Sequence, residues 1–109
     1  MKKIILIFAL LIAGYGFAQK PNVKTEKVGD LTKATYFYAN GNIEQQGTFN
    51  SQGKLQGEWV SYDINGNKLS VGHYDNGLKV GTWLFWQDGV VKKVEYKNSK
   101  VADVNEVSQ

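Results

Sequence analysis

The sequence predicts an all-β protein: an antiparallel β-meander of hairpin repeats in a single twisted sheet, preceded by a cleavable signal peptide. Three observations predict it. A pattern of glycines and aromatic residues recurs at a spacing of about 24–25 residues. Asn-Gly and Asp-Gly pairs, which favour tight hairpin turns, separate short segments rich in aromatic and β-branched residues. After residue 18, no segment combines a helical apolar period with helix caps.

The first element in the chain is the predicted signal peptide, residues 1–18. Two lysines precede a nearly continuous apolar run from Ile4 to Phe17, and Gly16 and Ala18 supply the small residues of a cleavage site. The alternative is a retained N-terminal anchor, but the run is shorter than the roughly 20 apolar residues of a membrane span. We therefore expect cleavage after Ala18 and a periplasmic or secreted protein.

The composition of the remaining 91 residues narrows the possible functions. They hold 11 lysines, 10 acidic residues and no arginine, the residue best suited to phosphate and base-edge contacts, so nucleic-acid binding is not expected. They also hold no cysteine, and apolar packing must therefore replace the disulfides that small exported domains often use. The required apolar surface is present, because all 11 aromatic residues of this part lie between Tyr36 and Tyr96.

After the signal peptide, residues 19–32 are expected to form an N-terminal linker and residues 33–98 the repeat β domain. The polar tail, residues 99–109, is expected either to fray or to add a seventh strand. The predicted strands span residues 33–39, 42–49, 57–64, 68–75, 81–87 and 90–97. Tight two-residue turns are predicted at four dipeptides that end in glycine, namely Asn40-Gly41, Asn65-Gly66, Asn76-Gly77 and Asp88-Gly89.

The repeat itself consists of a glycine, an aromatic residue, two glycines, a tryptophan, an aromatic residue and a glycine. The first copy comprises Gly47, Phe49, Gly53, Gly57, Trp59, Tyr62 and Gly66, and the second Gly72, Tyr74, Gly77, Gly81, Trp83, Trp86 and Gly89. Strand alternation predicts that Trp83 and Phe85 share one face of the sheet while Trp86 lies on the other. Residues at equivalent positions, Tyr38, Tyr62 and Trp86, are predicted to stack as a ladder across the units.

These motifs resemble the MORN repeat in its bacterial variant form, and the repeat arrays grouped as the YwqK-type antitoxin family. The resemblance covers about residues 35–97, while the segment 90–104 lacks the Gly-x-Trp pair, as a terminal capping unit would. The resemblance implies an elongated, twisted meander of hairpins. It also implies scaffolding, protein contact or lipid-headgroup contact as the activity, and it supplies no catalytic residues.

Residues that could carry chemistry are few. His73 is the single histidine, with no second histidine or cysteine to form a metal site or to act with a nucleophile. Asp63, Asn65 and Asn67 have the spacing that opens a calcium loop, but Lys68 and Tyr74 occupy the positions of its glycine and glutamate. The segment is therefore expected to be a hairpin turn. We expect no enzyme activity, no metal and no cofactor.

The aromatic residues are the candidates for binding. Exposed rings on a rigid sheet can anchor a protein partner or stack on sugars, although the same rings could instead be structural. The residues selected are Trp59, Tyr62, Trp83, Phe85 and Trp86. We therefore expect a non-catalytic binding or scaffold module with an unknown protein partner. The alternative is a protein that binds an envelope glycan or a lipid surface.

Overall fold

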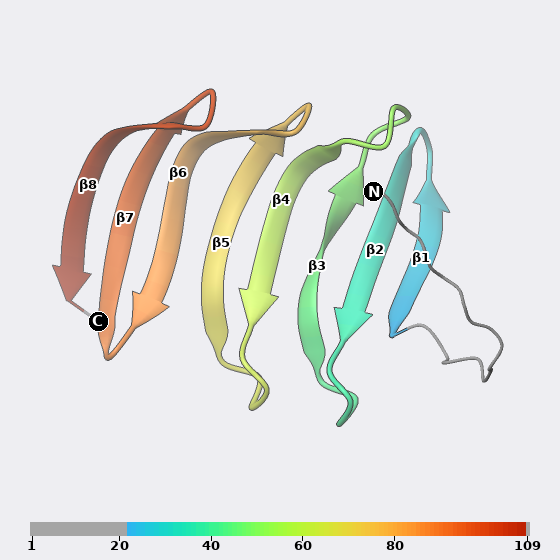
Figure 1. The fold of residues 1–109 in the computed structure, drawn as a ribbon, viewed down its shortest axis with the longest axis horizontal. Coiled ribbons are helices and arrows are strands. Elements are labelled where there is room, and N and C mark those ends of the chain that lie inside the picture. Colours follow the sequence, from blue (N-terminus) through green and yellow to red (C-terminus); the bar gives the residue numbers. More distant parts are fainter. Residues whose placement is uncertain (1–21, 109) are drawn as a thin grey trace, which may run out of the picture.

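The computed structural model describes residues 22–108, which form one open sheet of eight strands (Figure 1). All neighbouring strands are antiparallel and follow one another in sequence order, and the described residues contain no helix. The prediction of an all-β meander is thus confirmed. The strands are β1 (Val23–Val28), β2 (Leu31–Phe37), β3 (Ile43–Phe49), β4 (Leu55–Tyr62), β5 (Lys68–Asp75), β6 (Leu78–Gln87), β7 (Val90–Lys97) and β8 (Lys100–Ser108).

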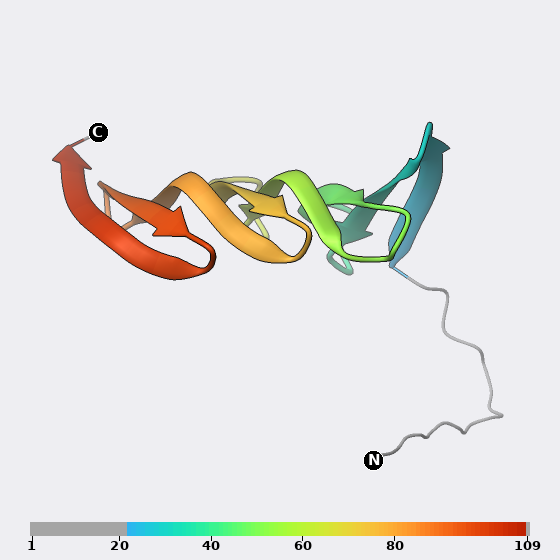
Figure 2. The same ribbon diagram turned by 90° about the horizontal axis from the view of Figure 1, so that it is seen from above.

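The sheet is elongated, curved and twisted. Its longest dimension is 49 Å, and the strands bend so that successive hairpins coil along that axis (Figure 2). Each strand packs mainly on the strands before and after it in the sequence, as in other repeat proteins. The predicted signal peptide lies outside the described residues.

Both ends of the sheet extend beyond the predicted repeat domain. Strand β1 lies within the segment predicted to be a linker, residues 19–32, and β8 occupies most of the predicted tail. Both segments lack the clear apolar alternation of inner strands because they form the sheet edges, where charged residues prevent further strand pairing. In β1 these residues are Lys24, Glu26 and Lys27, all exposed.

The turns are of two kinds, and the prediction of two-residue turns holds for half of the dipeptides. Asn76-Gly77 and Asp88-Gly89 form two-residue turns in which both residues have positive φ, between 51° and 89°. This is the backbone form that matches the twist of a hairpin. The turn at Asn98-Ser99 has the same form, with φ angles of 52° and 68°.

The other two dipeptides lie in three-residue loops, which corrects the prediction. The Tyr38 N–H donates to the Asn42 carbonyl at 2.8 Å, and the Gly41 N–H donates to the Tyr38 carbonyl at 2.9 Å. Only the glycine takes a positive φ, 94° at both Gly41 and Gly66. A dipeptide ending in glycine suits both loop lengths, since each needs a left-handed residue at its end.

The core of this single-layer sheet is one row of side chains across the middle of the strands, which we name the central row. It takes one buried residue from each of β2 to β7: Ala34, Gly47, Trp59, Gly72, Trp83 and Val94. Trp59 and Trp83 are only 6% and 5% exposed. In the central row a tryptophan alternates with a glycine through the inner strands.

Two bulges explain why tryptophan and glycine alternate. Pairing between β3 and β4 jumps from Gln46–Val60 to Thr48–Gln56, and the same jump recurs between β5 and β6. At each bulge a glycine takes a positive φ, 82° at Gly57 and 72° at Gly81. Strands β4 and β6 therefore begin before these glycines, at Leu55 and Leu78, and not at them as predicted.

The bulges bring each indole ring onto a glycine of the preceding strand. A Cβ atom added to Gly47 would overlap the ring of Trp59, and one added to Gly72 would overlap the ring of Trp83. The sequence pattern of a glycine followed by Gly-x-Trp is therefore a packing motif. At the ends of the array, Ala34 stands where the inner units have tryptophan and Val94 stands where they have glycine.

Candidate functional site

The sheet has two faces, which we name by their central residues. The tryptophan face carries Trp59, Trp83 and Phe85. The valine face carries the residues that alternate with them, namely Val60, Tyr62, Val71, Leu84 and Trp86. Register places Val60 opposite Val71 and Val71 opposite Leu84, so these three side chains form a row across β4, β5 and β6. All five residues of the valine face are half-buried.

Two of the five candidate binding residues, Trp59 and Trp83, belong to the core. The indole N–H of Trp59 donates to the Thr48 carbonyl at 3.0 Å, and that of Trp83 donates to the His73 carbonyl at 3.1 Å. Each indole N–H thus already has its hydrogen-bond acceptor within the sheet, and each ring is almost fully buried. Their main role is to hold the repeat units together. The other three candidates, Tyr62, Phe85 and Trp86, are half-buried.

The aromatic contacts differ from the predicted ladder. In the described part of the chain they run along the tryptophan face, with centroid distances between 5.1 and 6.4 Å. The residues in this series are Phe49, Trp59, Tyr74, Trp83, Phe85 and Tyr96. Tyr38 does not stack on Tyr62. Its hydroxyl donates to the Tyr62 carbonyl at 2.7 Å, and this bond joins the two neighbouring turns.

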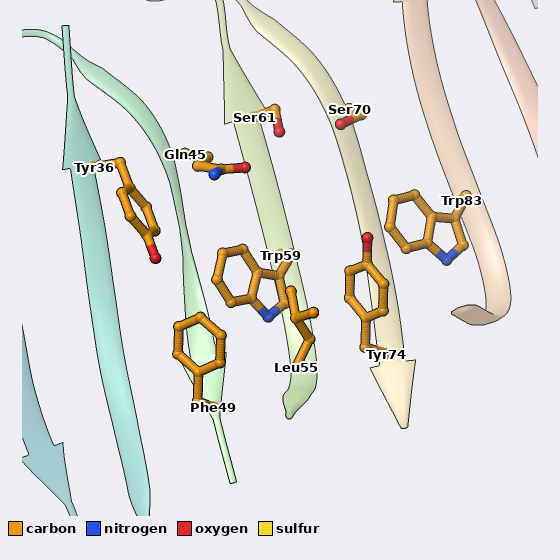
Figure 3. A pocket seen from close by; sticks show the side chains of 9 residues that line it. All are labelled: Tyr36, Gln45, Phe49, Leu55, Trp59, Ser61, Ser70, Tyr74 and Trp83. Carbon is orange, nitrogen blue, oxygen red and sulfur yellow. The ribbon is translucent and has the colours of Figure 1, made fainter. Parts of the chain in front are cut away.

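A hollow of about 190 Å³ opens on the tryptophan face (Figure 3). Its lining residues come from β2 to β6: Tyr36, Gln45, Phe49, Leu55, Trp59, Ser61, Ser70, Tyr74 and Trp83. Gln45 is paired with Ser61, and Ser61 with Ser70, so these three polar side chains form a row directly beside the central row. Tyr36 lies at one end of the polar row, because it is paired with Gln45.

The polar groups of this hollow are available to a ligand. Within residues 22–108, the side chains of Tyr36, Gln45, Ser61, Ser70 and Tyr74 take part in none of the protein's hydrogen bonds. All five are half-buried, and none of the nine lining residues is charged. The sequence analysis missed Gln45, Ser61 and Ser70, because a single polar residue on a strand indicates only solvent exposure.

The Asp63 segment forms the expected hairpin turn. The Asp63 carboxylate accepts the N–H groups of Asn65 and Asn67, both at 2.9 Å, and the Asp63 N–H donates to the Asn67 carbonyl. These hydrogen bonds, that of the Asn67 N–H above all, lower the pKa of Asp63 from its ordinary value of 3.8. The carboxylate thus closes its own loop. His73 is exposed on β5.

Comparison with known proteins addresses the repeat directly. The family model of the MORN repeat variant matches residues 32–51 and 55–76. The chain carries MORN repeats. The two matched MORN segments are the β2–β3 and β4–β5 hairpins, and the β6–β7 hairpin lies outside the match, with a two-residue turn in place of their three-residue loops. The grouping with the antitoxin family stays a prediction.

Two further comparisons gave no relatives of this MORN-repeat chain. No curated protein matches it, and no solved structure matches it either. Among residues 22–108 there is no helix long and apolar enough to cross a membrane. The same residues hold no cluster of three or more potential metal-ligating side chains.

Proposed function

We propose that the chain is an exported, non-catalytic binding module whose MORN-repeat sheet holds a protein partner on its valine face. The observation that carries this proposal is the row of Val60, Val71 and Leu84. It lies on a face that no second layer of the described chain covers. Tyr62 and Trp86 lie on the same face, and both residue types are common in the energetically dominant parts of protein interfaces.

The physical argument rests on the number of layers. A sheet with apolar residues on one face normally buries that face against another layer. Here the rings on the tryptophan face partly bury one another, because they pack edge-on in two of the units, with 5.1–5.2 Å between ring centroids. Val60, Val71 and Leu84 neighbour one another across the strands but stay only half-buried, and a partner would remove their remaining surface from water at a gain of about 25 cal/mol per Å².

Export is part of the proposal and rests on the N-terminal sequence. Lysines, an apolar run and the small residues before position 19 together match a signal peptide. N-terminal sequencing of the protein recovered from the cell envelope or the medium should find Gln19 as the first residue. Recovery of the intact N-terminus from the cytoplasm alone would contradict export.

The partner can be sought by affinity capture from the cell-envelope fraction with the processed chain, compared with variants of each face. Val71→Lys and Leu84→Lys place a charge in the centre of the valine face and should abolish retention of the captured protein. Gln45→Leu changes the opposite face and serves as the matched control. The proposal fails if the folded protein captures nothing, or if the valine-face variants capture the same protein equally well.

A further inference from the structure

We propose that the hollow on the tryptophan face is a binding site for a single uncharged sugar ring. This inference goes beyond the proposed protein partner and uses the opposite face of the sheet. It is carried by the coincidence of three properties in one place: unpaired polar groups, an aromatic floor and the absence of charge.

The polar groups match what a sugar offers. Gln45 provides an amide with two donors and an acceptor, and Ser61 and Ser70 provide hydroxyls that can both donate and accept. The three lie in line across β3, β4 and β5, and Figure 3 shows the Gln45 amide directed toward Ser61. Because none bonds to another protein group in the described chain, a row of sugar hydroxyls could pair with them without breaking an existing bond.

The apolar lining matches the other side of such a ligand. A sugar ring has an apolar surface of C–H groups, which packs on aromatic side chains. Trp59 lies at the centre of the hollow, between Phe49 and Tyr74 (Figure 3). Because Trp59 itself is only 6% exposed, the half-buried rings of Tyr36, Phe49 and Tyr74 would supply most of the contact.

Size and charge exclude several other ligands. The hollow has a volume of about 190 Å³. It is smaller than the roughly 300–1,000 Å³ of pockets that hold drug-sized molecules. Its size suits a single ring. No lysine or carboxylate lines it, so a phosphate, a lipid headgroup or a cationic ligand would find no opposite charge.

The test is a titration of the processed chain with the methyl glycosides of glucose, galactose, mannose and N-acetylglucosamine, followed by ¹H–¹⁵N NMR. At least one glycoside should shift the side-chain amide signals of Gln45 and the indole signal of Trp59 in a saturable manner, with a Kd in the range of about 1–10 mM. The Trp86 indole, on the opposite face, should not move and provides an internal control.

Neighbouring residues on β3 provide a matched pair of variants. Gln45→Leu removes the polar group in the hollow, whereas Gln46→Leu makes the same change on the valine face. Gln45→Leu and the double variant Ser61→Ala/Ser70→Ala should each weaken the affinity at least about fivefold, the loss of one or two hydrogen bonds. Gln46→Leu should leave it unchanged, and circular dichroism verifies that all variants are folded.

Three outcomes would overturn the inference. They are no saturable shift with any of the four glycosides, equal affinity in the Gln45→Leu and Gln46→Leu variants, and shifts of the hollow that appear only with anionic phosphatidylglycerol vesicles. Each is distinguishable from failure of the protein-partner proposal, because capture of that partner depends on Val71 and Leu84 and is measured separately.

Discussion

At the scale of single residues, the fold depends on two glycines whose lack of a side chain makes room for an indole ring. Gly47 and Gly72 have φ values outside the left-handed region, so a turn does not require glycine at either position. Glycine is required there because an indole ring lies directly on the backbone. The same ring then donates its N–H to the carbonyl of the next residue, Thr48 or His73, which fixes it in place.

Gly72→Ala should therefore destabilise the protein by about 1–3 kcal/mol, the usual cost of forcing an additional methyl group into a packed site. Chemical denaturation followed by circular dichroism measures the change. His73→Ala, at the neighbouring exposed position, should change the free energy of unfolding by less than about 0.5 kcal/mol. If the two variants were equally stable, the close packing of Trp83 on Gly72 would be refuted.

Trp83→Phe keeps an aromatic ring but removes the indole N–H that bonds the His73 carbonyl. Together with the smaller ring, this should lower the free energy of unfolding by about 2–3 kcal/mol. Trp86→Phe is the control, since Trp86 is half-buried on the other face, and its cost should stay below about 1 kcal/mol. A similar decrease in the free energy of unfolding for the two variants would show that residues of the central row contribute no more to stability than half-buried residues do.

At the scale of strands and turns, the three-residue loops are closed by side chains as well as by backbone. Asp63 accepts two backbone N–H groups of its own loop, and Asn50 accepts the N–H groups of Gln52 and Lys54 in the equivalent way. Since one acceptor is a carboxylate and the other an amide, only the loop at Asp63 depends on protonation. A charged acceptor also forms the stronger hydrogen bond.

The stability that Asp63 contributes should therefore vary with pH. Its pKa is lowered in the folded protein, so the contribution is fully present above about pH 4, near the ordinary pKa of 3.8. It is lost as the pH falls through the lower folded value. Thermal unfolding of the wild type and of Asp63→Asn should show a higher Tm for the wild type at pH 7 and converging values as the pH falls below the ordinary pKa of 3.8. A difference that stays constant over this range would contradict the assignment.

The inner strands were predictable from the sequence, whereas β1 and the bulges were not, and for β8 the sequence left a frayed tail and an added strand as alternatives. Turn dipeptides such as Asn76-Gly77 mark the ends of the inner strands, and the segments between the turns show no helical apolar period. Strand β1 carries charges at three of its six positions, and the sequence of such an edge strand resembles that of a linker. The alternation of side chains predicts the face on which Trp59 lies. It does not predict the bulge that brings the ring of Trp59 onto Gly47.

The candidate site was predictable only in its residue types. The sequence indicated that aromatic residues were the source of binding, but register determines which of them stay accessible. Gln45, Ser61 and Ser70 are far apart in sequence and become neighbours only through the pairing of three strands. Each is an ordinary surface residue until its two partners are known.

At the scale of the whole molecule, stability is distributed along a line. Each strand pairs only with the strands beside it in the sequence, so no residue closes the sheet from a distance. Repeat proteins of this kind gain stability with each unit that stacks on its neighbours. The unit here is a pair of strands such as β3 and β4 with its turn, and it contains one bulge, one central-row glycine and the tryptophan that packs on it.

A duplicate of residues 43–67 inserted directly after Asn67 should therefore fold as two additional strands. The junction reproduces the native step from Asn42 to Ile43, so the turn and the alternation of strands are preserved. Urea unfolding should show a higher midpoint and an m-value larger by about a quarter, since ten strands replace eight. A lower midpoint, or two separate transitions, would show that the units do not couple as described.

The substitutions at the two ends of the central row confine the indole packing to the inner strands. Val94 leaves no bare backbone on which β8 could place an indole, and the residue of β8 opposite Val94 is Val104. At the other end, Ala34 on β2 brings no ring onto β1, its outer neighbour. The outermost strands therefore lack the Gly–Trp fit that fixes the inner strands to one another.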